Sequence, residues 1–372
     1  MQASYWEDKY WPGTFDFLII GMGYTGLATA IELKAREPKA RIAIVDRAAW
    51  SRGASLRNAG FACFANLGEM LADLETQNEE EVYALCKDRF DGLQSLKNKY
   101  GSQIDYTENG SYESFSKSDK RSLEKCLDYL QRANKLMYGE LGLDRVFTYS
   151  SKSFINSGMG SIENAYEGSI NTAKLYDALR QEALEKGVEC FGGCTYESHE
   201  GEQVLDVKFV EGQSLKSKHL LFCTNAFASE HSNEDIVPAR GTVFITQPFD
   251  HSISEGIHMY NQGYYYWRAL DGRILLGGAR NLDKEGETTK ELSQNPKIVS
   301  ELKRFLQEEI VGSEVQIAQE WSGIMAMSND GSKRPIIKKL EKSVFLAARL
   351  GGMGVALSAQ TGKQLAELVL NP

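Results

Sequence analysis

Three glycines and one aspartate near the start of the chain have the spacing of a dinucleotide-binding turn. Gly21, Gly23 and Gly26 follow an apolar run at 17–20, and Asp46 ends a second apolar run. Glycines at such a turn let the backbone approach a pyrophosphate, while the N–H groups of the following helix point at it. A carboxylate about twenty residues further on can accept both ribose hydroxyls and would repel a 2′-phosphate. The spacing therefore predicts an adenine dinucleotide site that disfavours NADP.

The segments around these residues fit this interpretation. The first apolar run is expected to be a strand, and Leu27, Ala30 and Ile31 would form one face of the helix that follows. Pro38 disfavours helix at the residue before it, ahead of a strand at 42–46. Glycine clusters also occur in ordinary strand-to-helix turns. The order of strand, turn, helix, strand and acid nevertheless favours the dinucleotide site.

Two further turns rich in small residues could also approach a bound group. The first, at 53–61, contains one cation and one amide, Arg57 and Asn58. The second, at 351–355, lies near the other end of the chain between an expected strand at 344–348 and a final helix. Two strand-to-helix turns rich in glycine are therefore expected, one near each terminus.

Composition and charge exclude several classes of protein. With 51 acidic and 42 basic residues and a net charge of −9, a nucleic-acid surface is not expected. The six cysteines lack CxxC spacing and the five histidines are dispersed, which predicts reduced thiols and no metal site. Residues 1–11 lack the apolar core of a signal peptide, and the stretch 17–31 is too short to span a membrane. We therefore expect a cytoplasmic protein.

The length of 372 residues exceeds the usual size of one core, so two packed domains are expected. Amphipathic helices are predicted around 82–93 and 123–130, and a further helix begins at Asn171 or Thr172. Asp-Gly at 271–272 between alternating runs predicts a hairpin. Strands are expected at 188–191, 204–210, 219–223, 242–246, 264–268, 274–276 and 344–348, and a charged helix at 288–309.

Taken together, these motifs identify a family. Over nearly its whole length the chain resembles the FAD-dependent oxidoreductases of the D-amino acid oxidase, glycine oxidase and sarcosine oxidase family. The segment 4–6 is similar to the start of the amine-oxidising branch that includes gamma-glutamylputrescine oxidase. The resemblance rests on motifs that follow one another at 21–26, 53–61, 238–241, 271–278, 320–323 and 351–362.

The resemblance implies an α/β fold with two domains. One is a Rossmann-like FAD-binding domain of the GR2 type, and the other is an inserted α+β substrate domain built on an antiparallel sheet. The FAD-binding domain would be discontinuous, with segments 1–90, 160–235 and 320–372. The substrate domain would comprise 91–159 and 236–319.

The resemblance also implies which residues hold FAD. The first glycine turn would bind the pyrophosphate, Asp46 the ribose, the 53–61 turn the flavin ring, and 224–225 the adenosine. The turn at 351–355 would meet the pyrimidine edge of the flavin, where a helix N-terminus can stabilise negative charge that develops on the reduced ring. The implied cofactor residues are Gly21, Gly23, Tyr24, Thr25, Gly26, Asp46, Arg47, Ser55, Arg57, Asn58, Gly60, Thr224, Asn225, Gly351, Gly352, Met353, Gly354 and Val355.

Several positions depart from the family pattern. Met325 and Gly352 stand where some members carry an arginine for the substrate carboxylate, which makes a plain amino acid oxidase doubtful. Leu275 stands where sarcosine-oxidase-type members carry a lysine used with oxygen, so the electron acceptor is either oxygen or another carrier. The turn at 53–61 has no histidine and the region of Gly323 no cysteine, so FAD is expected to be non-covalent.

The expected reaction is oxidation of a C–N bond in a small amine or N-substituted amino acid. A hydride would pass to flavin N5, leaving an imine that water hydrolyses. Strand alternation places Tyr264, Tyr266 and Arg268 on one face, where two phenols and a guanidinium could bind an amine with a distal acid. Ordinary sheet packing is the alternative for these three residues. Further carboxylate candidates are Arg240, Arg280 and Arg334.

Other activities remain open at this point. An enzyme with the same fold could oxidise a hydroxyl-bearing carbon, and a flavoprotein subunit could pass electrons to a partner. An NAD-dependent dehydrogenase would also satisfy the first motif. A flavin bleached by an amine without air would separate these possibilities.

Overall fold

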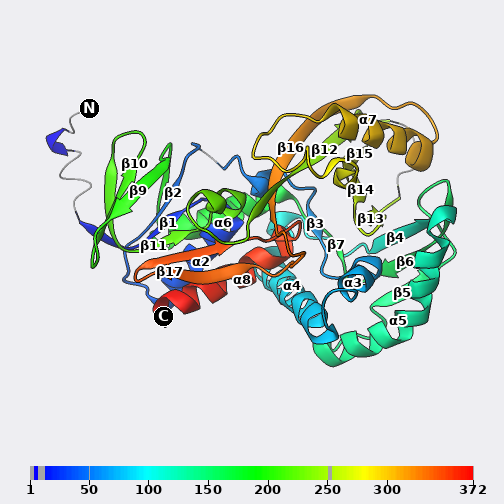
Figure 1. Ribbon diagram of the computed structural model, residues 1–372, viewed down its shortest axis with the longest axis horizontal. Helices are drawn as coiled ribbons and strands as arrows, with labels where there is room; N and C mark the ends of the chain where they lie inside the picture. Colours follow the sequence, from blue (N-terminus) through cyan, green and yellow to red (C-terminus); the bar gives the residue numbers. More distant parts are fainter. Residues whose placement is uncertain (1–3, 7–12, 50, 250–253, 372) are drawn as a thin grey trace.

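The computed structural model describes residues 4–6, 13–49, 51–249 and 254–371. Residues 1–3 and 7–12, on which the expectation about a signal peptide depends, lie outside this range. Figure 1 shows two large sheets side by side. Within the described residues, no helix combines the length and the apolar character that a membrane crossing requires.

The first sheet is built around parallel strands. β1 (Thr14–Ile20) pairs in parallel with β2 (Ile42–Asp46) on one side and β11 (Ser214–Phe222) on the other. The order β17-β18-β11-β1-β2-β8 brings strands from the start, the middle and the end of the chain together. The other strands of this sheet are β8 (Glu189–Gly192), β9 (Tyr196–Glu200), β10 (Leu205–Phe209), β17 (Ile336–Glu341) and β18 (Val344–Ala348).

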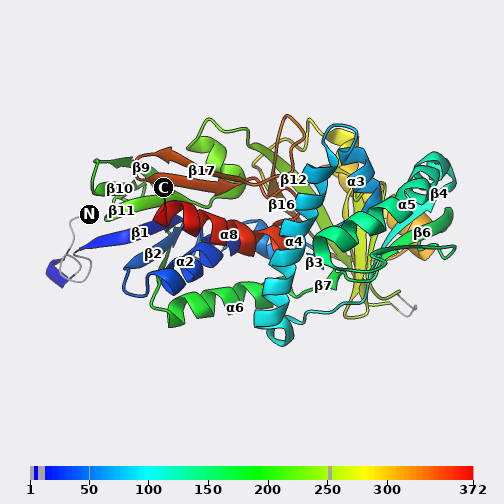
Figure 2. The same cartoon turned by 90° about the horizontal axis from the view of Figure 1, so that it is seen from below.

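Three helices cover one face of this sheet. α2 (Tyr24–Arg36) packs against both α6 (Thr172–Glu185) and α8 (Gly354–Leu370), and Figure 2 shows the three beneath the strands. Alternation along β1 explains the two cores, because Phe17 and Ile19 join the helix side whereas neighbouring residues join the opposite side. This sheet with its helices is the predicted Rossmann-like unit.

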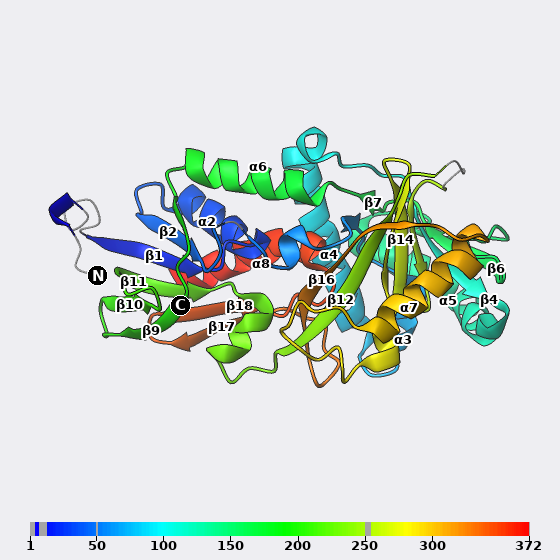
Figure 3. The same ribbon diagram turned by 90° about the horizontal axis from the view of Figure 1, so that it is seen from above.

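The second sheet is antiparallel except for one pair. Its order is β16-β12-β15-β14-β13-β4-β6-β5, and β13 runs parallel to β4. Figure 3 shows the long strands β12 and β16 side by side at the boundary with the first half of the molecule. The strands are β4 (Ser111–Ser116), β5 (Phe147–Ser150), β6 (Gly158–Asn164), β12 (Val237–Thr246), β13 (Ile257–Tyr260), β14 (Tyr265–Leu270), β15 (Arg273–Gly278) and β16 (Ile317–Met327).

Four further helices pack on the second sheet or on other helices. α7 (Pro296–Phe305) packs on β14 and β15, whereas α5 (Lys120–Leu141) packs on β4 and β5. α4 (Glu79–Tyr100) packs against α8 of the first half, and the short α3 (Leu67–Asp73) packs against α5. The small sheet of β3 (Phe61–Ala62) and β7 (Gly168–Ser169) lies near α8.

The structure confirms the α/β class, both glycine-rich strand-to-helix turns and the predicted hairpin. Asp271 and Gly272 both have positive φ, 52° and 67°, as a type I′ turn requires. The prediction of a charged helix at 288–309 was wrong about where the helix begins. α7 begins at Pro296, because the side chain of Asn295 caps it and proline suits the first helical position. It ends in a π-helical turn at Leu306–Val311.

Two expected domain boundaries fall inside strands. The boundary at 160 divides β6 and the boundary at 320 divides β16, yet both strands pair within the second sheet, apart from one bridge between Ala326 of β16 and Gly351. Hydrogen bonding between distant strands decides this membership, and local patterning did not reveal it. The division into a cofactor domain and a substrate domain remains a proposal.

Candidate active site

A cavity of about 960 Å³ has walls from both sheets. This volume is within the range of small-molecule sites, which extends to about 1,000 Å³. The predicted cofactor residues from all five segments, 21–26, 46–47, 55–60, 224–225 and 351–355, line it, with the exceptions of Gly26 and Gly60. Residues that are more than 300 positions apart, such as Gly21 and Gly354, therefore face the same space.

The first glycine turn is shaped by close backbone contacts. Gly21 has a φ of +107°, and a Cβ there would lie 2.7 Å from the carbonyl oxygen of Cys223. A Cβ on Gly26 would lie 2.0 Å from the carbonyl oxygen of Gly21, so Gly26 lets α2 approach the end of β1. Gly26 thus acts on the shape of the turn, outside the cavity wall.

Asp46 is fixed beside this turn. Its Oδ2 accepts a hydrogen bond from the backbone N–H of Met22 at 2.9 Å, and its Oδ1 accepts one from Ala48 at 3.0 Å. Each carboxylate oxygen keeps further acceptor capacity, since it can take more than one hydrogen bond. The carboxylate is therefore held in the cavity wall and can still receive ribose hydroxyls.

Two helices begin at the cavity without a side-chain cap from their own N-cap residue. The N-cap residues are Gly23 for α2 and Met353 for α8, and neither caps its helix with a side chain. In the described part of the chain, the N–H groups of Thr25, Gly354 and Val355 have no acceptor. By contrast, asparagine side chains cap α3, α4, α6 and α7. Both exposed helix ends can bind negative charge.

Hydrogen bonds hold the turn at 53–60 against β16 of the second sheet. Arg57 donates from Nη1 to the carbonyl oxygen of Ser322 at 2.8 Å, and Trp321 donates from Nε1 to the carbonyl oxygen of Arg57 at 3.1 Å. Asn58 accepts from the backbone of Gly60 and donates within its own turn. Trp321, with its ring N–H on this turn, anchors the turn to β16.

Other predicted residues fix the shape of the turns. Ser55 accepts from the backbone N–H of Tyr24 at 3.0 Å, and the buried phenol of Tyr24 donates to the carbonyl oxygen of Thr172. The guanidinium of Arg47 lies 3.9 Å from the centroid of the Phe227 ring. These groups line the cavity and also hold neighbouring segments together.

The segment at 224–225 links the middle of the chain to its end. Asn225 has a φ of 48°, and its Oδ1 accepts from the backbone N–H of Arg349 at 3.1 Å. The hydroxyl oxygens of Thr224 and Ser358 are buried in the cavity wall without a hydrogen-bond partner. Buried polar atoms of this kind normally have a partner, so the wall fits a polar ligand.

The opposite wall comes from the second sheet. Tyr264 and Tyr266 line the cavity together with Met325 and Gly241. The Tyr266 phenol has no hydrogen-bond partner among the described residues, and burial raises its pKa to about 12. It is thus a neutral phenol that can donate a hydrogen bond into the cavity. Tyr264 lies just before β14, so the strand that was expected to begin at residue 264 begins at Tyr265.

Arg268 occupies a different place from the one expected. Alternation on β14 is as predicted, because Tyr265 and Trp267 pack beneath α7. Arg268, however, does not line the cavity: its Nη2 donates to the carbonyl oxygen of Ile170 at 3.1 Å, next to Gly60. Its guanidinium is buried, which lowers its pKa. The geometry gives Arg268 a packing role between two segments.

The other arginine candidates also differ in place. Arg240 is buried in an ion pair with Glu287 at 2.7 Å, and Arg334 donates to the carbonyl oxygen of Glu81. Of the three, Arg280 lines the cavity. Leu275 is buried in an apolar cluster with Ala59 and Val243.

The cavity wall also contains a charged cluster that the sequence did not predict. Lys333 lies 2.7 Å from both Glu69 and Asp73, and Arg89 lies 3.8 Å from Glu69. Burial opposes ionisation of Glu69, but the charges of Lys333 and Arg89 outweigh it and lower its pKa. Lys333 and Glu69 are 264 residues apart in sequence, so no local pattern could have linked them.

Comparison with known proteins decides the family. The family model "FAD dependent oxidoreductase" matches residues 16–368. The chain belongs to this family. It is therefore an FAD-dependent oxidoreductase, and its cofactor is FAD. The uncapped helix ends, the ribose-competent carboxylate and the unpartnered hydroxyls of the cavity fit that cofactor.

Individual relatives are more distant. The chain is 22% identical to gamma-glutamylputrescine oxidoreductase of Escherichia coli strain K12, over 96% of this chain and 84% of that protein. The structure of iminodiacetate oxidase from Chelativorans sp. BNC1 has a TM-score of 0.76 at 15% identity, covering 95% of each chain. That of glycine oxidase from Geobacillus kaustophilus has a TM-score of 0.75 at 18% identity, covering 97% of this chain and 95% of that one.

Proposed function

We propose that this FAD-dependent oxidoreductase oxidises the C–N bond of a small amine or N-substituted amino acid. A hydride would pass from the carbon to flavin N5, and water would hydrolyse the resulting imine. The observation that carries the proposal is the cavity itself: two uncapped helix ends face a wall that presents the phenols of Tyr264 and Tyr266. The names of two similar proteins, gamma-glutamylputrescine oxidoreductase and iminodiacetate oxidase, support an amine as the substrate.

The residues around the first turn would hold the nucleotide. The free N–H group of Thr25 and the glycines at 21 and 23 fit a pyrophosphate, and Asp46 fits a ribose. The free N–H groups of Gly354 and Val355 would lie against the pyrimidine edge of the flavin. When bound, FAD supplies the hydride acceptor of the reaction.

The second-sheet wall would orient the substrate. Gly241 has no side chain, and Met325 lies close to it, with Cε 3.1 Å from the position that a Cβ would take. The neutral phenol of Tyr266 can donate a hydrogen bond, and the apolar residues beside it exclude water. Hydride removal requires a neutral amine held in line, and this wall can provide that orientation without a strong acid or base.

FAD is proposed to be bound without a covalent bond. Cys63 lines the cavity, with its sulfur 3.9 Å from that of Met353. Burial, with the charge of Glu167 adding to it, raises the pKa of the Cys63 thiol well above its usual value, so the reactive thiolate is disfavoured. Denaturation should release all the flavin into a filtrate, and flavin retained by the protein would contradict this proposal.

The proposed activity is tested by anaerobic mixing. Purified holoprotein would be mixed without air with a panel of amines, N-substituted amino acids and matched hydroxy acids, while flavin absorbance is followed. We expect bleaching by one or more amines and by none of the hydroxy acids. Admission of air with assay for peroxide would then identify oxygen as acceptor or require another carrier. Bleaching by hydroxy acids alone would contradict C–N oxidation.

A further inference from the structure

Two cations of the second-sheet wall have no acidic partner. Arg280 is half-buried and Lys284 is exposed, and both line the cavity near Tyr264. Neither forms an ion pair with any carboxylate of the described residues. On the α3 side of the same cavity, by contrast, Lys333 is neutralised by Glu69 and Asp73. The wall around Arg280 therefore carries uncompensated positive charge.

The backbone directs Arg280 to this wall. Gly278 has a φ of +123°, and a Cβ there would lie 1.9 Å from the carbonyl oxygen of Tyr264. Ala279 also has a positive φ, 58°, which is uncommon for a residue with a side chain, and its N–H donates to Tyr264 at 2.7 Å. These two residues end β15 with a sharp change of direction, after which Arg280 begins a short 3-10 helix beside the cavity.

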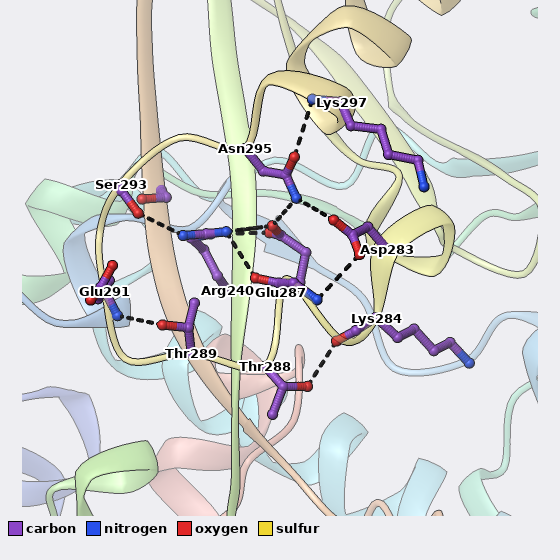
Figure 4. Close-up of polar contacts among 12 residues, drawn as sticks. Arg240, Asp283, Lys284, Glu287, Thr288, Thr289, Glu291, Ser293, Asn295 and Lys297 are labelled. Carbon is purple, nitrogen blue, oxygen red and sulfur yellow. Dashed lines mark hydrogen bonds and ion pairs between the residues drawn. The ribbon is translucent and has the colours of Figure 1, made fainter.

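A buried polar network fixes the segment that follows. Arg240 of β12 pairs with Glu287, and both side chains are almost completely buried, with exposures of 7% and 0%. Arg240 also donates to Ser293 at 2.8 Å and to the carbonyl oxygen of Gly286 at 3.0 Å. Figure 4 shows this network and shows the side chain of Lys284 extending away from it. The Lys284 ammonium lies 5.7 Å from the centroid of the Tyr264 ring, and this contact leaves its positive charge without an acidic partner.

The same network ties the segment to α7. Asn295, the N-cap of α7, donates from Nδ2 to both Asp283 and Glu287 at 2.8 Å. Lys297 donates to the carbonyl oxygen of Leu282. The segment 280–295 is thus held at both ends and in its middle. Arg280 therefore starts from a fixed backbone position, which lowers the entropy lost when it binds a ligand.

We propose that Arg280, with Lys284 beside it, binds a carboxylate of the substrate that lies away from the reacting C–N bond. This inference rests on the proposed function and narrows the substrate class to amines with a distal carboxylate. A guanidinium can bind a carboxylate with two parallel hydrogen bonds, and a second cation adds attraction. Arg280 takes the role that strand alternation had suggested for Arg268, which does not line the cavity.

Binding of unreactive probes tests the inference without turnover. Calorimetry would compare valerate with its neutral counterpart pentanamide on the FAD-loaded protein at constant ionic strength. The wild type should bind valerate at least about tenfold more tightly than pentanamide, since hydrogen bonds to charged groups are strong. Arg280→Met should abolish the preference while FAD content stays unchanged. Equal binding of both probes by the wild type would overturn the inference.

Two further variants make the result specific. Arg304→Met removes a positive charge from exposed α7 in the same half of the molecule and should leave the preference intact. Lys284→Met changes an exposed residue, so folding is not at risk, and should weaken valerate binding by about threefold. An undiminished preference in Arg280→Met, or loss of FAD from that variant, would overturn the assignment. If Arg280→Met does not fold, an unchanged preference in Lys284→Met would overturn it.

Turnover separates this inference from the proposed function. Anaerobic bleaching by 5-aminovalerate would be compared with bleaching by pentylamine. Valerate preference with no bleaching by any amine would retain the carboxylate site and contradict C–N oxidation. Bleaching by both amines with equal efficiency, and no valerate preference, would retain the oxidation and contradict the carboxylate site.

Discussion

The two walls of the cavity are built in different ways. The cofactor wall uses backbone groups: two helix ends without caps, glycines in close contact, and one carboxylate held by two N–H groups. The second-sheet wall uses side chains, with the phenols of Tyr264 and Tyr266 and the cations of Arg280 and Lys284. A backbone site depends on local turns that recur at fixed spacing, whereas a side-chain site depends on how distant strands are placed.

The largest effect is expected on the cofactor wall at Gly26. A Cβ at this position would meet the carbonyl oxygen of Gly21 at 2.0 Å, and backbone cannot move as a flexible side chain can. Gly26→Ala should lower the free energy of unfolding by more than about 3 kcal/mol and abolish FAD retention. Denaturant unfolding and flavin absorbance would measure both.

The matched control is Gly139 in α5, where an added Cβ meets nothing within 4 Å. Gly139→Ala should be neutral or should stabilise by about 0.5–1 kcal/mol, since alanine favours helix. Equal stability of the two variants would contradict the account of the turn.

The next effect concerns Asp46. Asp46→Ala removes the acceptor proposed for the ribose and the hydrogen bonds to Met22 and Ala48. FAD should bind about 100-fold more weakly, as expected for the loss of charged hydrogen bonds. Titration of the apoprotein with FAD would measure the change, and an unaltered dissociation constant would remove Asp46 from the nucleotide site.

The free energy of unfolding should depend on pH through a buried carboxyl group in the second half of the molecule. Burial raises the pKa of Glu113, on β4, to about 8, while it accepts a hydrogen bond from Gly68. The native state therefore keeps a proton that the unfolded chain has lost, so this contribution is complete at acidic pH and disappears as pH rises towards 8. Glu113→Gln should remove this decline, about 3 kcal/mol between pH 5 and 8. An identical slope in both proteins would refute it.

The smallest effect should distinguish two residues of β14. Tyr266→Phe removes a phenol that has no partner among the described residues and should slow anaerobic flavin bleaching about tenfold. Arg268→Met alters a residue outside the cavity wall and should leave the rate within about twofold. Stopped-flow absorbance would measure both rates. A slow Arg268 variant with a normal Tyr266 variant would restore the role expected from alternation.

The parts predicted from sequence are those set by local geometry. The turn at 21–26, the helix face of Leu27 and the hairpin at 271–272 depend on neighbouring residues, so pattern sufficed. The place of Arg268 could not be predicted, because alternation gives the face of a strand and not the residue that reaches a cavity. Arg240, another candidate for binding the substrate carboxylate, forms an ion pair with Glu287 instead. Only the tertiary fold brings these two residues together.

The most direct test of the central claim is a crystal structure of the FAD complex. The pyrophosphate should lie within hydrogen-bond distance of the N–H group of Thr25, and the pyrimidine edge of the flavin should lie against the N–H groups of Gly354 and Val355. One face of the flavin ring system should lie towards Tyr266. A cofactor bound at one helix end alone, with the 351–355 turn free of contact, would contradict it.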